Sequence, residues 1–117
     1  MAEVLLMEDD TDFRSQFRKG LEDAGHEVVE VSDGKEGMVK FRDRQPDMVI
    51  TDIVMDNGEG TGVLLEIREV APQVPVITIS GNVMYLSSSR RLGAAKALLK
   101  HFRMTELLDS VESALAA

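Results

Sequence analysis

The 117-residue chain is long enough for one globular domain with its own core, and its 44% hydrophobic and 29% charged residues exclude a disordered chain. A formal net charge of −8 argues against direct nucleic-acid binding, because phosphate contacts need clustered Lys and Arg. The lack of cysteine excludes disulfides, thiolate metal sites and cysteine nucleophiles. The apolar runs are far shorter than a membrane span and no signal segment is recognised, so we expect a cytoplasmic protein with protein partners.

Short apolar runs alternate with stretches of helical periodicity along the chain. Continuous apolar runs are typical of strands that are covered on both faces, as in a parallel sheet. In chain order the predicted strands are residues 4–7, 27–31, 48–51, 76–79 and 97–99.

A helix is predicted after each strand. The first carries Phe13 and Phe17 as core residues, with Asp10 or Thr11 as its N-cap and Gly25 as its end. The fourth spans roughly residues 83–92 and is the weakest helical pattern, because its serines are poor helix formers. In the second and third helices, the apolar residues expected at the core are Met38, Val39, Phe41, Val63, Leu64, Ile67, Val70 and Ala71.

This alternation predicts an α/β fold that forms a single domain over residues 1–117. Because each crossover between parallel strands is right-handed and both sheet faces need cover, we expect a five-stranded parallel sheet with helices on both faces. Ligands of such open sheets bind outside the carboxyl ends of the strands. The residues that directly follow each strand are therefore the candidates for a functional site.

Polar residues that suit phosphoryl chemistry stand at four of these strand ends. Glu8 and Asp9 follow the first strand, Asp52 ends the third, Ser80 follows the fourth and Lys100 follows the fifth. Carboxylates that share a pocket repel one another unless a cation neutralises them, and an all-oxygen ligand set suits Mg²⁺. The lysine adds a compact positive charge and the serine a hydroxyl donor. The chemistry indicated is phosphoryl transfer.

In these residues and their order, the chain resembles the receiver domains of two-component response regulators over nearly its whole length. That family has an acidic pair after strand one, a phospho-accepting Asp after strand three, a Ser or Thr after strand four and a Lys after strand five. Further matches are the pairs Asp33-Gly34, Pro46-Asp47 and Gly93-Ala94. The resemblance implies a flavodoxin-like fold with strand order 2-1-3-4-5.

The resemblance also implies a metal site and a phosphate donor. Mg²⁺ would be bound directly by Asp9, by Asp52 and by the backbone carbonyl of Val54, whereas Glu8 would act through a water on the metal. The donor would be the phosphohistidine of a sensor histidine kinase or a phosphotransfer protein. Asp52 would be the acceptor of the phosphoryl group.

Two further residues would take part in the reaction and its consequences. Lys100 would neutralise charge that develops on the phosphoryl oxygens, and Ser80 would move to hydrogen-bond the product. Gly81 leaves room for an attacking water, so self-dephosphorylation is expected rather than turnover of an external substrate. The resemblance places a downstream protein target on the face formed by helix four, strand five and helix five.

Three positions depart from the family pattern. Ala97 stands where receivers usually have Tyr or Phe, so we expect phosphorylation to be sensed through the fourth helix and its loop or through Tyr85. His101 replaces a proline that is usually joined by a cis bond, and we predict a trans Lys100–His101 peptide because a non-proline cis bond costs about 2.5–4 kcal/mol. Asp56 replaces another proline; we expect a more mobile loop there, with Asp56 or Glu59 adding negative charge near the metal.

Other interpretations of the same residues stay open. The chain could be an interaction module with a vestigial phosphorylation site that works without Mg²⁺. It could also be a Mg²⁺-dependent phosphatase with an aspartyl intermediate, but such enzymes generally need a second Asp where this chain has Val54. The acidic run at residues 8–10 could serve only as a capped helix start. His26 and His101 are expected to face solvent.

Overall fold

The computed structural model of the protein describes residues 2–54 and 60–117. Strands and helices alternate along the described chain, as predicted. The strands are β1 (Glu3–Met7), β2 (Glu27–Val31), β3 (Met48–Asp52), β4 (Val76–Ser80) and β5 (Lys96–Leu99). The helices are α1 (Thr11–Asp23), α2 (Gly34–Asp43), α3 (Gly60–Val70), α4 (Val83–Arg91) and α5 (Met104–Ala116). Asp52 and Ser80 are therefore the last residues of their strands.

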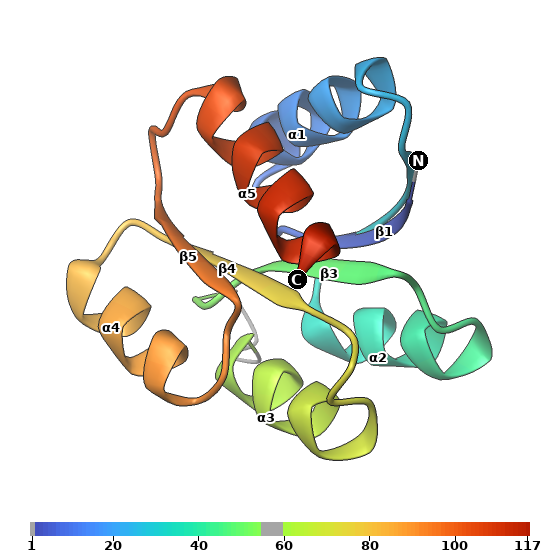
Figure 1. Ribbon diagram of the computed structural model, residues 1–117, viewed down its shortest axis with the longest axis vertical. Coiled ribbons are helices and arrows are strands. Elements are labelled where there is room, and N and C mark those ends of the chain that lie inside the picture. The colour runs from blue at the N-terminus through green and yellow to red at the C-terminus, as the bar shows by residue number, and fades with distance from the viewer. Residues whose placement is uncertain (1, 55–59) are drawn as a thin grey trace.

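The five strands form one parallel sheet in the order β2-β1-β3-β4-β5, which confirms the predicted topology. Helices α1 and α5 lie side by side on one face of the sheet, and α2, α3 and α4 cover the other face (Figure 1). The chain leaves β1 toward β2 and later returns to pair β3 with the other side of β1. Strand order thus reverses between β1 and β3, and their carboxyl ends form the crevice where ligands of such sheets bind.

The core consists of two apolar layers that share the sheet. Side chains of a strand point alternately to its two faces, so Leu5 and Met7 pack with α2 and α3, whereas Val4 and Leu6 pack beneath α1 and α5. Burying an aliphatic side chain of this size contributes about 1.5–3 kcal/mol. The two layers hold the sheet rigidly from both sides and thereby fix the positions of the strand ends.

Side-chain caps set the start of several helices close to the strand ends. Asp10 is the N-cap of α1, as predicted, and its carboxylate accepts hydrogen bonds from two backbone N–H groups of the first turn, each at 3.0 Å. Asp33 caps α2 and Asn82 caps α4 in the same way. Gly25 and Gly93 follow α1 and α4 with φ angles of 94° and 109°, a left-handed conformation that glycine adopts without steric cost.

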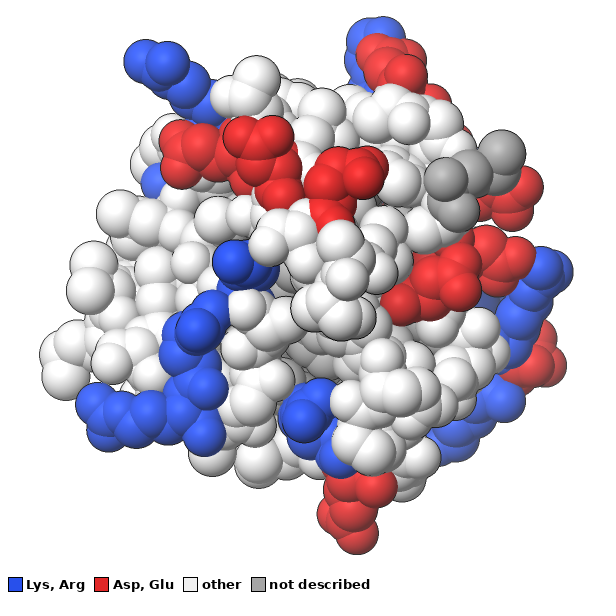
Figure 2. All heavy atoms as spheres, in the orientation of Figure 1, with Lys and Arg blue, Asp and Glu red and all other residues white. Residues whose placement is uncertain are grey.

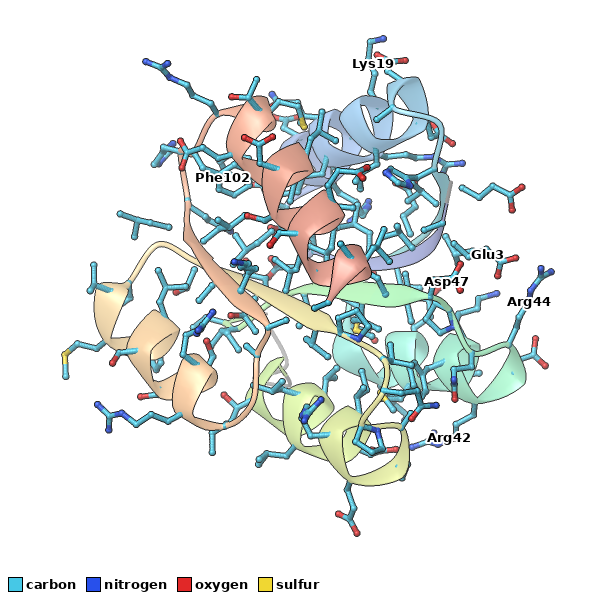
Figure 3. The ribbon with its side chains drawn as sticks, viewed as in Figure 1. Glu3, Lys19, Arg42, Arg44, Asp47 and Phe102 are labelled. Atoms are coloured by element: carbon cyan, nitrogen blue, oxygen red, sulfur yellow. The ribbon has the colours of Figure 1, made fainter. Side chains whose placement is uncertain are left out.

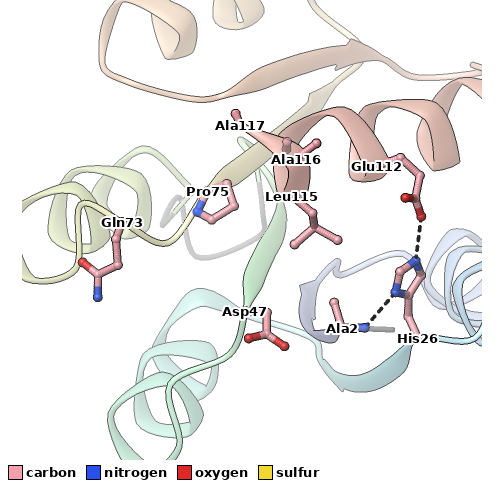
Figure 4. Close-up of a pocket in the computed structure, with 10 residues that line it drawn as sticks. Ala2, His26, Asp47, Gln73, Pro75, Glu112, Leu115, Ala116 and Ala117 are labelled. Atoms are coloured by element: carbon pink, nitrogen blue, oxygen red, sulfur yellow. Dashed lines mark hydrogen bonds and ion pairs between the residues drawn. The ribbon is translucent and has the colours of Figure 1, made fainter.

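The prediction that His26 faces solvent is wrong. The residue is only 6% exposed, and its Nδ1 accepts a hydrogen bond from the backbone N–H of Ala2 at 3.1 Å. Its Nε2 lies 3.7 Å from Oε1 of Glu112 on α5 (Figure 4). These residues line a cavity of about 520 Å³ that also includes Pro75 and Asp47, at the amino ends of the strands and thus at the opposite edge of the sheet from the predicted site.

Val39 and Val70, both predicted at the core, are also exposed, at 57% and 62%. The buried face of α2 contains Met38 and Phe41, three residues apart, and Val39 lies about 100° further around the helix than Met38. Val70 is the last residue of α3, beyond the turn whose Ile67 packs on the sheet. Apolar character alone therefore gave the wrong face at these two positions.

Charged groups on the surface add ion pairs between neighbouring elements. Glu3 pairs with Arg44 and donates its backbone N–H to Asp47 at 2.8 Å, and Figure 3 shows these three residues together beside β1 and α2. Arg42 of α2 pairs with Glu66 of α3 at 2.6 Å. Exposed pairs of this kind contribute about 0–1 kcal/mol each, so the fold depends mainly on its core.

Two other expectations from the sequence concern membrane spans and the loop after β3. Among the described residues, no helix is long and apolar enough to span a membrane. The predicted mobility of the loop, and the predicted contributions of Asp56 and Glu59 to its charge, lie outside the described residues.

Candidate functional site

The structure brings the predicted polar residues together at the carboxyl edge of the sheet. Met7 of β1 pairs with Thr51 of β3, so the next residues, Glu8 and Asp52, lie side by side at the ends of these two strands. Ser80 ends β4, and its backbone carbonyl accepts a hydrogen bond of 2.8 Å from the backbone N–H of Lys100. Asp9 offers a carboxylate oxygen to the same cluster. The side chains of Glu8, Asp9, Asp52 and Lys100 therefore lie together, and Ser80 adjoins them through its backbone while its hydroxyl is bonded to Asn82.

An ion pair between Lys100 and two buried carboxylates forms the centre of this site. The Nζ of Lys100 lies 2.6 Å from Oδ2 of Asp52 and 3.4 Å from Oε1 of Glu8. The two carboxylate side chains are 2% and 1% exposed. Neither oxygen accepts a hydrogen bond of suitable angle, although both lie within ion-pair distance of the ammonium. One cation faces two carboxylates, so their negative charge is incompletely balanced when both are ionised.

The second oxygen of each buried carboxylate is fixed by the backbone. Oδ1 of Asp52 accepts a hydrogen bond of 2.9 Å from the N–H of Val54, and Oε2 of Glu8 accepts one of 3.1 Å from the N–H of Asp10. Each carboxylate is thereby oriented with its remaining oxygen toward Lys100. One oxygen of Asp52 is thus held by the backbone, and the other faces the ammonium of Lys100.

Burial shifts the proton affinities of the charged groups. Burial raises the pKa of Glu8 to about 7; the hydrogen bond from Asp10 opposes this, and the charge of Asp52 and a hydrogen bond with Asp9 reinforce it. For Lys100, burial lowers the pKa, but the carboxylates of Asp52 and Glu8 together raise it above its ordinary value. Near neutral pH the lysine is therefore charged, whereas a pKa of about 7 leaves Glu8 partly protonated.

The donor set of the site fits a hard divalent cation. Glu8, Asp9 and Asp52 each offer a carboxylate oxygen, and these oxygens all lie within 4.8 Å of one another. Glu8 and Asp52 are buried, and each has one oxygen without a hydrogen bond. All-oxygen sites with several carboxylates suit Mg²⁺, which would supply the positive charge that Lys100 alone does not provide.

Ser80 is held at the junction between β4 and α4. It is buried, and its Oγ accepts a hydrogen bond of 3.0 Å from the backbone N–H of Asn82, the N-cap of α4. A movement of the Ser80 hydroxyl toward the site would therefore break a contact at the start of α4.

Two contacts at the site were missed in the sequence. Arg14 donates a hydrogen bond of 2.8 Å from Nη1 to the backbone carbonyl of Glu8 and so fixes the end of β1. Phe13, predicted only as a core residue, also places its ring under the ammonium of Lys100, with 5.1 Å between Nζ and the ring centroid. The sequence feature that could have indicated both contacts is the position of Phe13 and Arg14 in the first turn of the helix that follows the acidic run.

The chain next to Lys100 shows how two departures from the family pattern are accommodated. The Lys100–His101 peptide is trans, as predicted, since the described residues contain no cis bond. His101 is exposed, also as predicted, and it has a φ angle of 70°, in the left-handed region that non-glycine residues seldom adopt. Ala97 pairs with Thr78 of β4 in the sheet.

Comparison with known proteins gives consistent results. Residues 4–112 match the response regulator receiver domain family. The chain is 34% identical to the probable transcriptional regulator ycf27 of Guillardia theta, over 96% of this chain and 44% of that protein. It is 30% identical to the response regulator receiver protein CpdR of Brucella abortus, over 100% of this chain and 99% of that protein. The chain thus spans less than half of the first relative and nearly all of the second.

Solved structures share the fold. The crystal structure of the response regulator protein TrrA from Thermotoga maritima, in complex with Mg²⁺ and BeF, has a TM-score of 0.90 and 27% sequence identity. The match covers 97% of this chain and 99% of that one. The fold, the strand-end residues and the family match agree, and the chain belongs to the response regulator receiver domain family.

Proposed function

We propose that this receiver domain accepts a phosphoryl group on the carboxylate of Asp52 from the phosphohistidine of a sensor histidine kinase or a phosphotransfer protein. The observation that carries the proposal is the setting of Asp52: a buried carboxylate at the switch point of the sheet, with one oxygen held by Val54 and the other facing Lys100 without a hydrogen bond. A nucleophile needs this combination of fixed orientation and an available lone pair.

In the proposed reaction, an oxygen of Asp52 forms a bond to phosphorus while the bond between phosphorus and the donor's imidazole nitrogen breaks. The imidazole leaves with the electron pair. Charge spreads over the phosphoryl oxygens as this happens, and Lys100, at 2.6 Å from the acceptor carboxylate, is placed to neutralise it. Ser80 would then turn its hydroxyl from the N–H of Asn82 toward the phosphoryl group.

Mg²⁺ would be held by Asp9, Asp52 and the backbone carbonyl of Val54, with Glu8 acting through a water molecule. When bound, it would supply the positive charge needed to bring an anionic phosphoryl group beside the carboxylates. The complex of TrrA with Mg²⁺ and BeF supports Mg²⁺ as the cation, because that protein shares the fold and 27% of the aligned residues.

Self-dephosphorylation would return the domain to its resting state. A water would attack phosphorus, the bond to Asp52 would break, and phosphate would leave. Space beside Gly81 supports access of small molecules, because a Cβ at this residue would meet nothing within 4 Å. The alternative of a phosphatase acting on external substrates is less favoured, because Val54 occupies the position of the acid-base carboxylate and its side chain cannot transfer protons.

A downstream protein target would contact the face formed by α4, β5 and α5. Several large apolar side chains are exposed on this face, and contact with a partner protein would bury them. They are Val83, Met84, Tyr85, Leu92 and Leu99. Figure 2 shows a broad uncharged surface on the left of the molecule, where Figure 1 places α4, with Lys and Arg along its lower border. Burial of these side chains would stabilise a complex with a protein target, and the net charge of −8 disfavours a nucleic acid.

Incubation with acetyl phosphate and Mg²⁺, followed by intact-mass analysis, tests the proposal. We expect the wild type to gain the mass of one phosphoryl group, and both the Asp52→Asn variant and the wild type with EDTA to gain none. If the adduct hydrolyses before mass analysis, binding of beryllofluoride, a stable analogue of the phosphoryl group, serves as the control. An adduct that persists in Asp52→Asn, or a wild type that neither gains mass nor binds beryllofluoride, would contradict it.

A further inference from the structure

The aromatic ring of Phe13 lies beneath the ammonium group of Lys100. Phe13 lies in the first turn of α1, directly after the acidic residues, and its ring centroid is 5.1 Å from Nζ of Lys100. The ammonium therefore contacts this ring as well as the carboxylates of Asp52 and Glu8. The lysine side chain has four rotatable carbon groups, and a contact with an aromatic ring restricts the positions that its ammonium can adopt.

The ring of Phe13 is itself held by contacts with two other rings. It stacks on Phe17 of the next helical turn, with 5.7 Å between centroids, and Phe17 stacks in turn on Phe102 at 5.2 Å. The ring of His101 also packs edge-on against Phe13, with 5.9 Å between centroids. The left-handed conformation of His101, with φ of 70°, turns the chain directly after Lys100.

We propose that Phe13 is a positioning residue that holds the ammonium of Lys100 at the acceptor carboxylate through a cation–π contact. The proposal rests on the proposed function of Asp52 as phospho-acceptor. An aromatic face attracts a cation without fixing the direction of its N–H bonds. The ammonium can therefore shift from Oδ2 of Asp52 to an oxygen of the incoming phosphoryl group and keep its contact with the ring.

A purely structural role for Phe13 makes a different prediction. Leucine would fill much of the same apolar space against Phe17 but has no π face. If Phe13 served only packing, Phe13→Leu would lower stability and leave the phosphorylation rate of the folded protein unchanged. If it positions Lys100, the rate falls even where the protein is fully folded.

The test compares phosphorylation rates with acetyl phosphate at saturating Mg²⁺ in the full chain. We expect Phe13→Leu to slow the reaction by about fivefold to tenfold and Phe13→Tyr, which keeps the π face, to stay within about twofold of the wild type. The matched control is Phe41→Leu, a buried phenylalanine in the other core layer, which should lose stability but keep its rate. Mg²⁺ affinity should be unchanged in all three.

A second readout does not depend on phosphorylation. The ring should shift the NMR signals of the ε-CH₂ protons of Lys100 upfield in the wild type, and Phe13→Leu should remove this shift. Unchanged lysine signals together with an unchanged rate in Phe13→Leu would overturn the inference while leaving Asp52 as the acceptor. A wild type that is not phosphorylated at all, with the lysine signal shifted by the ring, would instead overturn the proposed function.

Discussion

The carboxyl edge of the sheet and the α4–β5 side of the molecule are built differently. At the edge, buried charges are held by backbone N–H groups, by Lys100 and by the start of α1. On the α4–β5 side, α4 buries a single residue, Ser89, and leaves several apolar side chains exposed. Segments with few buried contacts open at the lowest free energy. The proposed chemistry would thus take place at the more tightly held of these two regions, and we expect α4 to be displaced more easily than the carboxyl edge.

A buried pair of hydroxyls joins the two regions. Oγ1 of Thr78 on β4 lies 2.7 Å from Oγ of Ser89 on α4, and Ser89 also donates to the carbonyl of Leu86 at 2.9 Å. Ala97 pairs with Thr78 on the neighbouring strand. Because alanine replaces the aromatic residue that receivers usually have there, we expect this hydroxyl pair, rather than an aromatic side chain, to link β4 to the position of α4.

The largest effect should come from removing the positive charge at the rigid edge. Lys100→Met leaves two buried carboxylates without their cation, so the free energy of unfolding in EDTA should fall by about 3 kcal/mol. Phosphorylation should slow by about 100-fold or more, because developing charge is no longer neutralised. Urea unfolding and the acetyl phosphate reaction measure the two effects. Lys96→Met is the matched control on β5, and equal losses in both variants would argue against a special role for Lys100.

The pH dependence of stability without Mg²⁺ tests the burial of Glu8. Its pKa is about 7 in the folded protein against an ordinary value of 4.5, so the folded state binds the proton more tightly. The unfolded chain therefore loses its proton first, so the stabilising contribution of Glu8 is complete below about pH 4.5 and is lost as the pH rises toward 7. The total loss is at most about 3 kcal/mol for this group.

Denaturant unfolding between about pH 4.5 and pH 8 measures this slope, and Glu8→Gln should flatten it. Mg²⁺ should stabilise the wild type more at the upper end of this range than at the lower, because the metal binds the ionised carboxylates. The same slope in Glu8→Gln as in the wild type would assign the pH dependence to other groups.

Gly60, the first residue of α3, tests how closely the rigid edge is packed. A Cβ at Gly60 would collide with the backbone carbonyl oxygens of Asp52 and Ile53, so α3 would have to move away from the acceptor. We expect Gly60→Ala to lose about 2 kcal/mol and to slow phosphorylation. Gly62→Ala in the same helix meets nothing within 4 Å and should be neutral or stabilising. Thermal unfolding measures the stability of both variants. A Gly60→Ala variant as stable as Gly62→Ala would contradict the predicted collision at Gly60.

The smallest effect is expected on the α4 side. Ser89→Ala leaves the hydroxyl of Thr78 without this partner and should cost about 1–2 kcal/mol, with faster amide hydrogen exchange confined to α4. The phosphorylation rate should stay within about twofold of the wild type, which separates this side from the edge. The exposed Ser88→Ala is the control. Faster exchange throughout the sheet would contradict the local role of the pair.

The strands and the five polar residues at their ends could be predicted because both follow from local pattern and topology. Glu8, Asp52 and Lys100 each follow directly after an apolar run, and a parallel sheet brings the carboxyl ends of all its strands to one edge. The cap at Asp10 was predictable for the same local reason.

Contacts between distant side chains could not be predicted in this way. His26 is buried and accepts the N–H of Ala2, and Phe13 lies under Lys100 where the segment after β5 returns to α1 and His101 contacts Phe13; neither contact leaves a periodic pattern. Val39 shows the related difficulty within one helix, where an apolar residue lies next to the buried stripe and faces solvent. These features depend on how the elements pack, which the sequence pattern does not specify.

The most direct test of the central claim identifies the residue that carries the phosphoryl group. Borohydride reduces an aspartyl phosphate to the alcohol, so treating the phosphorylated wild type and sequencing its peptides by tandem mass spectrometry marks the acceptor. The proposed function predicts conversion of Asp52 to homoserine, and no conversion when Mg²⁺ is removed. Conversion at Asp9 or at any other acidic residue, with Asp52 unchanged, would contradict it.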